Sequence, residues 1–273
     1  MSLLKTEWLK VKSYAAFWWL IGLTALSYPG ISYIFKTSYD NLGHREGKAE
    51  QAEVILKMLL GNPFSFPEVW HTITYASSIF VFIPAVVVIM FITNEYTYKT
   101  NRQNIIDGWS RNQFMLAKMI NVFIVALTVT ILCLVVILVI GLSNYNLSTA
   151  NKWDQAYYVG YFGLQTFSQL SIAFLIGFLI RKAFIALGVF LFYFMILENV
   201  LTGFGYFYKI EARKYLPIEV SDRMIPAPAF WGNFDKDNWL QTMSEKNYHV
   251  FYTILLTAII WVICFWINKK RDL

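Results

Sequence analysis

Residues 115–142 read MLAKMINVFIVALTVTILCLVVILVIGL, a run with one charged side chain, Lys118. A helix of about 20 mostly apolar residues crosses a hydrocarbon core ~30 Å thick, because each residue advances it by about 1.5 Å. Six segments of this kind predict spanning helices, at 15–35, 72–94, 115–142, 157–180, 183–207 and 249–268. The expected fold class is therefore an all-α integral membrane protein with six transmembrane helices.

The composition of the whole chain agrees with this fold class. Hydrophobic residues make up 57% and charged residues 15%, whereas a soluble domain has roughly 45–50% apolar and about 25% charged residues. The two cysteines, Cys133 and Cys264, lie far apart inside apolar runs and form neither a disulfide framework nor a metal-ligand spacing. The first apolar run continues to Phe35, so we expect a retained helix rather than a cleaved signal.

The charges predict the orientation of the chain in the membrane. Six spans place both termini on one side, and the segments on that side hold 12 basic and 4 acidic residues, a balance of +8. The opposite loops hold 11 basic and 12 acidic residues, a balance of −1. The positive-inside rule then makes both termini cytoplasmic. The basic excess behind the net charge of +6 lies in the cytoplasmic segments, where it sets the orientation of the chain. It does not indicate a nucleic-acid partner.

We expect a single transmembrane domain, 1–273, with three notable segments outside the spans. Residues 1–14 carry apolar side chains on one helical face, which predicts a helix resting on the inner leaflet; a frayed basic anchor is the alternative. Residues 36–71 and 208–248 are the expected extracytoplasmic loops. The second loop contains three prolines, so we expect short helices or re-entrant pieces there.

The cytoplasmic stretch between the second and third spans reads NEYTYKTNRQNIIDGWSR, residues 94–111. Thr100 with Gln103 and Ser110 with Gln113 read as capping boxes. Gly108 suits the left-handed residue that ends a helix. The pattern predicts a short helix within 99–110, followed at once by the third span.

The short helix carries apolar side chains on a basic surface. Ile105 and Ile106 suit a hydrophobic groove on a partner protein. Insertion of the same side chains into the lipid interface is the alternative reading.

At these residues the chain resembles the ABC-2 family of ATP-binding-cassette transporter permeases. That family has six spans, cytoplasmic termini, an amphipathic N-terminal helix and, after the second span, an acidic residue, a threonine, a short coupling helix, a Ser-Arg pair and a lysine. Glu95, Thr100, Ser110, Arg111 and Lys118 occupy those places, whereas Lys99 and Gly108-Trp109 replace the glycine and proline that the family often has. The resemblance implies that the residues coupled to the ATPase are Glu95, Thr100, Arg102, Ile105, Ile106, Ser110 and Arg111.

The resemblance also implies the partners of the chain. It implies the membrane subunit of an ATP-driven exporter in the cytoplasmic (inner) membrane of a bacterium, surrounded by lipid and paired with a second permease copy as a homodimer. Two cytoplasmic ATPase subunits would supply the energy. The chain lacks a Gly-rich loop ending in Gly-Lys-Ser/Thr, so ATP and Mg are expected in the ATPase and no cofactor, metal or catalytic residue in this chain.

One acidic residue lies inside a predicted span. Glu198 in the fifth span would cost a few kcal/mol if it faced lipid, so we expect it to face protein or water, together with Asn199 and Thr202. The tight Arg181-Lys182 turn makes the fourth and fifth spans neighbours. At a similar depth in the fourth span lie Gln165 and Gln169, which we expect to meet Glu198. These five residues are candidates for a substrate path; an equal alternative is a hydrogen-bonded cluster that fixes helix packing.

Two other functional classes were weighed against transport. An intramembrane enzyme is disfavoured, because His44, His71 and His249 are scattered over outer loops or their edges and neither His-Glu-x-x-His nor Gly-x-Ser-x-Gly occurs. A non-transporting sensor or assembly factor on the same fold stays open. Export is favoured over import because nothing indicates a docking surface for a soluble binding protein.

The predicted topology can be tested with single cysteines in a background without Cys133 and Cys264. Cysteines placed at Lys48, Lys152 or Lys236 should react with a membrane-impermeant maleimide only from outside, since these positions lie in the loops that lack a basic excess. A cysteine at Lys269 is the control and should react only from the cytoplasm. Cytoplasmic labelling at any of the three outer positions would contradict the six-span assignment.

Overall fold

The computed structural model describes residues 12, 15–42, 63–106, 108–144, 151–228 and 236–270. Within these ranges the chain is helical and contains no β-strand. The helices are α2 (Ala15–Leu42), α4 (Glu68–Ser78), α5 (Phe82–Thr97), α6 (Thr100–Ile106), α7 (Arg111–Ser143), α8 (Tyr157–Ile180), α9 (Ala183–Phe192), α10 (Glu198–Phe207), α11 (Pro217–Asp222) and α13 (Lys236–Lys270). A π-helix, Tyr193–Leu197, joins α9 to α10, and a 3-10 helix, Glu211–Tyr215, precedes α11.

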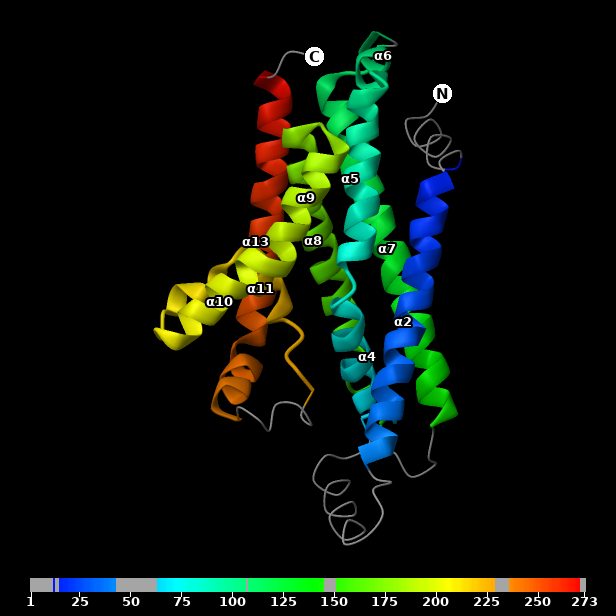
Figure 1. Ribbon diagram of the computed structural model, residues 1–273, viewed down its shortest axis with the longest axis vertical. Coiled ribbons are helices and arrows are strands. Elements are labelled where there is room, and N and C mark those ends of the chain that lie inside the picture. The colour runs from blue at the N-terminus through cyan, green and yellow to red at the C-terminus, as the bar shows by residue number, and fades with distance from the viewer. Residues whose placement is uncertain are drawn as a thin grey trace, which may run out of the picture.

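The all-helical membrane fold is confirmed. By length and composition α7, α8, the continuous rod α9–α10 and most of α13 can each cross a membrane, and α4 with α5 can form a fifth, bent span. α2 has 28 residues but is not among these helices, because Thr24, Ser27, Pro29 and Ser32 dilute its apolar residues. Figure 1 shows the start of α2, the helix α6 and the end of α13 at one end of the bundle, hereafter the α6 end.

The bend between α4 and α5 has a covalent cause. The two helices meet at 47°, and Pro84 lies in the first turn of α5. Proline has no amide hydrogen, so Pro84 cannot donate the bond to the Phe80 carbonyl that would continue α4 into α5. Ile83 donates to that carbonyl instead, at 3.1 Å. The chain therefore breaks just before Pro84.

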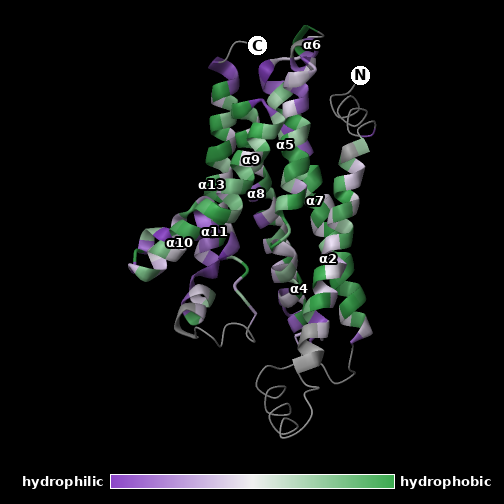
Figure 2. Ribbon diagram, viewed as in Figure 1, coloured by the Kyte–Doolittle hydropathy of each residue, from purple (hydrophilic) through white to green (hydrophobic). Residues whose placement is uncertain are grey.

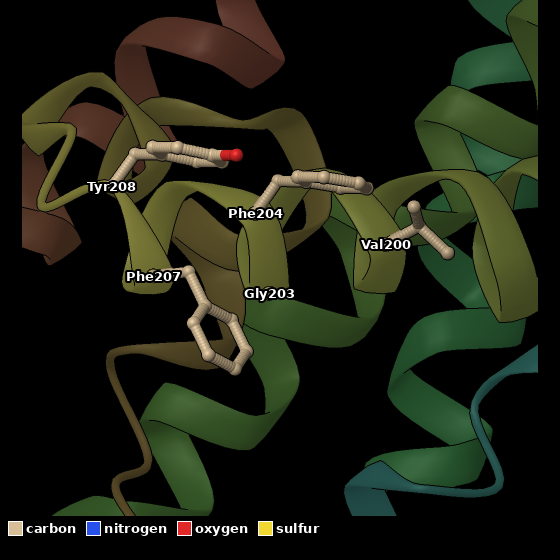
Figure 3. A pocket seen from close by; sticks show the side chains of 5 residues that line it. All are labelled: Val200, Gly203, Phe204, Phe207 and Tyr208. Carbon is tan, nitrogen blue, oxygen red and sulfur yellow. The ribbon is translucent and has the colours of Figure 1, made fainter.

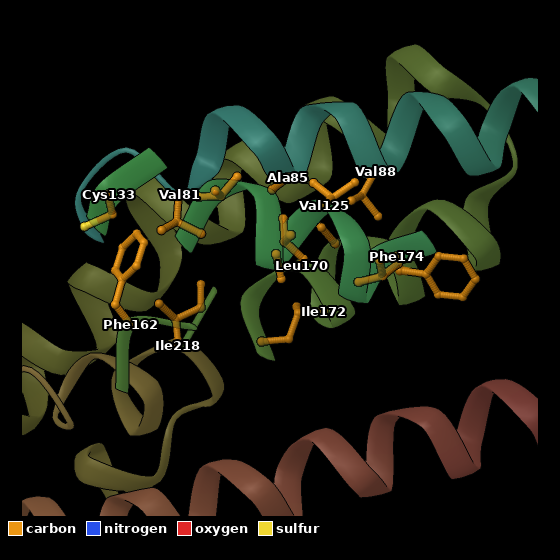
Figure 4. Close-up of a cluster of buried hydrophobic side chains, with 14 of the residues drawn as sticks. Val81, Ala85, Val88, Val125, Cys133, Phe162, Leu170, Ile172, Phe174 and Ile218 are labelled. Carbon is orange, nitrogen blue, oxygen red and sulfur yellow. The ribbon is translucent and has the colours of Figure 1, made fainter. Parts of the chain in front are cut away.

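α8 lies at the centre of the bundle. In the apolar 18-residue stretch of α8, 61% of the residues are buried. The corresponding share is 17–28% in the other three long helices, which present most of their surface to the surroundings. Side chains from α5, α7, α8 and α11 form one core, labelled in Figure 4. Figure 2 shows hydrophobic residues along most of the bundle and hydrophilic residues at the α6 end and around α11. Polar residues thus gather inside the fold around α11 as well as at the ends of the bundle.

The loops differ from their predicted bounds. α2 continues to Leu42, beyond position 36, and α13 begins at Lys236, well before position 249. Both helices extend beyond their apolar segments, because the backbone hydrogen bonds of a helix can continue through polar residues where tertiary contacts hold them. Such contacts hold the early part of α13. Trp239 Nε1 donates to the Ala227 carbonyl at 2.8 Å. The predicted interfacial helix, 1–14, lies outside the described residues except for Lys12.

Two glycines of α8 offer a matched test of this packing. A Cβ at Gly177 would lie 2.7 Å from Ile92 Cγ2 of α5, whereas a Cβ at Gly160 would meet nothing within 4 Å. Alanine favours a helix over glycine by about 1 kcal/mol, while overpacking costs about 1–3 kcal/mol. Gly177→Ala should therefore lower the melting temperature of the purified protein, and Gly160→Ala should leave it equal or higher. Equal melting temperatures in both variants would mean that α5 and α8 are less closely packed than described.

Candidate functional site

The short helix α6 ends at a glycine, as predicted. Gly108 has a φ of +97°, which a residue with a side chain rarely adopts. Its amide donates to the Ile105 carbonyl at 3.0 Å, and the Trp109 amide donates to the Asn104 carbonyl at 3.1 Å. This pair of bonds is a Schellman motif, which satisfies the last carbonyls of a helix.

Of the two predicted capping boxes, one is confirmed and one is wrong. The Ser110 side chain accepts from the Gln113 amide, and the Gln113 side chain accepts from the Ser110 amide, so this box begins α7. Thr100 is instead the first residue of α6, behind Lys99 with a φ of +54°. Its hydroxyl donates to the Glu95 carbonyl at 3.5 Å, which ties the start of α6 to the end of α5.

Arg111 joins the start of α7 to the end of α13. Its Nη1 donates to the carbonyls of Asn268 and Lys269, at 3.4 and 2.8 Å. Asn268 Nδ2 donates back to the Arg111 carbonyl at 2.8 Å. A guanidinium at the last carbonyls of a helix satisfies acceptors that have no partner within the helix. The Ser-Arg pair therefore caps one helix and clamps another.

The acidic residue and the lysine of the predicted motif form an ion pair inside the bundle. Glu95 Oε1 and Lys118 Nζ are 2.5 Å apart, with 4% and 0% of the side chains exposed. The ammonium also lies over the rings of Phe91 and Phe114, 4.9 and 5.1 Å from their centroids. This pair joins α5, the helix before α6, to α7, the helix after it.

α6 has an inner and an outer face. Asn101 and Asn104 are buried against the bundle, with 5% and 6% exposed. Ile106 is 83% exposed and Ile105 is half-buried. The side chain of Arg102 lies outside the described residues. An exposed isoleucine at the tip of the bundle is available to a partner.

A second polar region surrounds Glu198, which is buried although it lies in a largely exposed rod. Its Oε1 accepts from the backbone amides of Ile218 and Glu219, at 2.6 and 2.7 Å. These amides belong to the first turn of α11, whose donors have no partner within the helix. Glu198 therefore caps a helix that lies about 20 residues further along the chain.

The expected meeting of Glu198 with the glutamines is not observed. Gln165 and Gln169 each donate through Nε2 to Asp222 Oδ1, at 2.7 Å, and Gln169 also donates to Ser221 Oγ at 3.0 Å. α11 thus lies between the two predicted groups, because its polar ends offer both groups partners. Asn199 Nδ2 donates to the carbonyls of Phe194 and Met195, and Thr202 Oγ1 is buried with no partner among the described residues.

A cavity of about 330 Å³ opens between α4, α10 and α11. Glu198, Asn199 and Thr202 line it, together with Glu219 and Asp222 from the loop, whereas the two glutamines lie behind Asp222. Pro217 followed by Glu219 is typical of the first turn of a short helix. This pattern could have predicted α11, and with it the position of Glu219 and Asp222, from the sequence. Within the described residues no three His, Cys, Asp or Glu side chains could hold a metal ion.

The position of Asp222 changes its acidity. The side chain is exposed to the cavity, while protein surrounds the cavity on several sides. Partial removal from bulk water inside the cavity, followed by the nearby carboxylates of Glu219 and Glu198, raises the pKa of Asp222 to about 7. Hydrogen bonds from Gln165 and Gln169 act in the opposite direction.

A shallow hollow on the outer face of α10 is a poorer candidate. It is lined by Val200, Gly203, Phe204, Phe207 and Tyr208, and Figure 3 shows three aromatic rings around it. None of these residues is charged, and α10 leans away from the bundle at this point (Figure 1). Contact with lipid hydrocarbon is sufficient to account for such a surface.

Together these features define a multi-pass helical membrane protein with a short exposed helix tied between two of its long helices. The family model described as "ABC-2 family transporter protein" matches residues 3–197, more than two thirds of the chain. The chain belongs to this family and is a permease subunit of an ABC transporter. The family implies association with an ABC ATPase subunit and is typically not catalytic itself. Among curated proteins no match to the chain is found.

The Glu95–Lys118 pair can be tested by removing one charge or both. Lys118→Met leaves a buried carboxylate without its cation, which costs about 3–5 kcal/mol, whereas replacing a whole buried pair is often neutral. Thermal unfolding of the purified protein should therefore show a large loss in Lys118→Met and substantial recovery in Glu95→Gln/Lys118→Met. A double variant no more stable than Lys118→Met would show that the pair does not account for the loss.

Proposed function

We propose that the chain is the six-span, homodimeric permease of an exporter in the cytoplasmic membrane of a bacterium, driven by two copies of an ABC ATPase. α2 supplies the sixth span, and the α6 end faces the cytoplasm, in agreement with its basic residues. The observation that carries the proposal is α6 itself. It is a short helix with an exposed apolar tip, held at both ends to long helices that cross the bundle.

The contacts around α6 suit the transmission of force. A push on α6 reaches α5 through Thr100 and the Glu95 backbone, and α7 through the Ser110 cap. Arg111 passes it to the end of α13. The Glu95–Lys118 pair resists separation of α5 from α7, so these helices move together. ATP and Mg bind to the ATPase, and α6 is the coupling helix that follows its motion.

We assign the substrate path to the cavity beside α11. Glu198, Asn199 and Thr202 line it directly, while Gln165 and Gln169 hold its α11 wall through Asp222. Polar groups inside a membrane bundle are costly and commonly mark such paths.

Coupling can be tested at Ile106, with Gln103 on the same helix as the control, since both side chains are exposed. If Ile106 fits an apolar groove on the ATPase, Ile106→Asp would bury an unpaired charge there and weaken the complex by about tenfold or more. Gln103→Asp should have little effect. The measurements are copurification of the ATPase and substrate-stimulated ATP hydrolysis.

The half-buried Ile105 serves as a second position, with the unfolding temperature measured in parallel. A folded Ile106→Asp variant that binds the ATPase normally and hydrolyses ATP in a substrate-dependent manner would refute the assignment of α6. Substrate-independent hydrolysis in the wild-type complex would favour a sensor on the same fold.

A further inference from the structure

The charges in the cavity beside α11 do not balance. Three carboxylates line it, from Glu198, Glu219 and Asp222, and no lining residue is basic. Arg223 neutralises Glu219 through Nε and Oε1, which are 2.7 Å apart. The described partners of the other two carboxylates are neutral: backbone amides for Glu198 and glutamine side chains for Asp222. Two acidic side chains therefore face one cavity without a cation from the described part of the chain.

A second observation indicates that a ligand belongs there. Glu198 is only 4% exposed, and although its Oε1 accepts two bonds, its Oε2 accepts none from the described residues. The Tyr193 hydroxyl lies close enough to this carboxylate to interact with it. One turn along the same wall, Thr202 Oγ1 is also buried and unpaired. Buried polar atoms are usually paired, and a donor bound beside this wall would give these two oxygens a partner.

The rest of the wall indicates the chemical class of that donor. Ile79, Phe194 and Ile225 provide apolar surface, and Tyr75 adds an aromatic ring. A metal ion is a poor fit, because no three acidic, His or Cys side chains in the described ranges could hold one. An ammonium group supplies several donors and one positive charge, and a hydrocarbon or aromatic body would fill the apolar part.

We propose that this cavity binds the protonated amine of an amphiphilic cation, and that such a molecule is the transported substrate. The ammonium lies between Glu198 and Asp222, with Thr202 as a further acceptor. The assignment of this molecule as substrate rests on the proposed transport function. The binding itself is a property of the chain alone.

The test uses octylammonium as the probe and the full chain in nanodiscs of zwitterionic lipid, with empty nanodiscs as background. Octanol, which matches the probe in length but lacks its charge, is the control ligand. Wild-type protein should bind octylammonium at least about tenfold more tightly than octanol, because only the amine brings a positive charge to the two carboxylates. Equal affinity for the two would overturn the proposal.

Glu198→Gln and Asp222→Asn are the informative variants, since each keeps an acceptor oxygen for α11 or for the glutamines. Each should weaken octylammonium binding about tenfold and leave octanol unchanged. Glu211→Gln, a carboxylate that is 75% exposed outside the cavity, is the matched control and should bind as wild type. Unfolding temperatures identify any variant that fails to fold. Wild-type affinity in both folded cavity variants would overturn the proposal.

The pH dependence gives an independent readout. Asp222 faces Glu198 of α10, Glu219 of α11, Tyr75 of α4 and the two glutamines of α8. Its pKa of about 7 means that it gains its charge as the pH rises, so octylammonium binding should strengthen between about pH 6 and pH 8. Asp222→Asn should flatten this dependence. A slope unchanged in that variant would overturn the role of Asp222.

Binding and coupling fail separately. A chain that binds octylammonium but shows no ATPase association would keep the amine site and overturn the transporter proposal. A complex with substrate-dependent ATP hydrolysis but no preference for octylammonium over octanol would keep the transporter proposal and overturn the amine site.

Discussion

Hydrocarbon offers no hydrogen-bond partner, and this constraint determines where each polar group of the bundle lies. Hydroxyls on the long helices turn back to their own backbone, as Thr93 does toward the Ile89 carbonyl at 2.8 Å. Polar groups that cannot do so point to the centre. α8 therefore occupies the middle of the bundle, where its Gln165 and Gln169 donate to Asp222 of α11. Its Ser171 donates to the Phe167 carbonyl of its own helix at 2.7 Å and accepts from Trp261 Nε1 of α13 at 3.0 Å.

The same constraint makes the α6 end rigid. Glu95 and Lys118 are almost fully buried, so each needs the other, and α5 cannot slide against α7 without separating them. Arg111 adds α13 to this unit through its last carbonyls. A seven-residue helix is too short to be stable by itself. It exists here because a Schellman motif and its two neighbouring helices hold it.

The centre of the molecule differs from the α6 end, because a loop lies there among the long helices. The polar groups of this loop need partners inside the bundle. α11 has only six residues and arrives with unsatisfied amides and a carboxylate. Glu198 meets the amides and the glutamines meet Asp222, so polar residues of two spans and a loop satisfy one another. The π-helix before Glu198 changes the register of the rod at this point. Glu198 Oε2 and Thr202 Oγ1, beside the cavity, have no partner among the described residues.

The sequence alone determined the helical membrane class, the short helix with its Gly108 end and Ser110 cap, and the inward position of Glu198, because these depend on local hydropathy, capping and the cost of burying charge. It could not determine that Lys118 faces Glu95, that Arg111 reaches α13, or that α11 separates Glu198 from the glutamines. Those contacts join residues far apart in the chain. They depend on how the helices pack and where a loop enters the bundle, which no local pattern encodes.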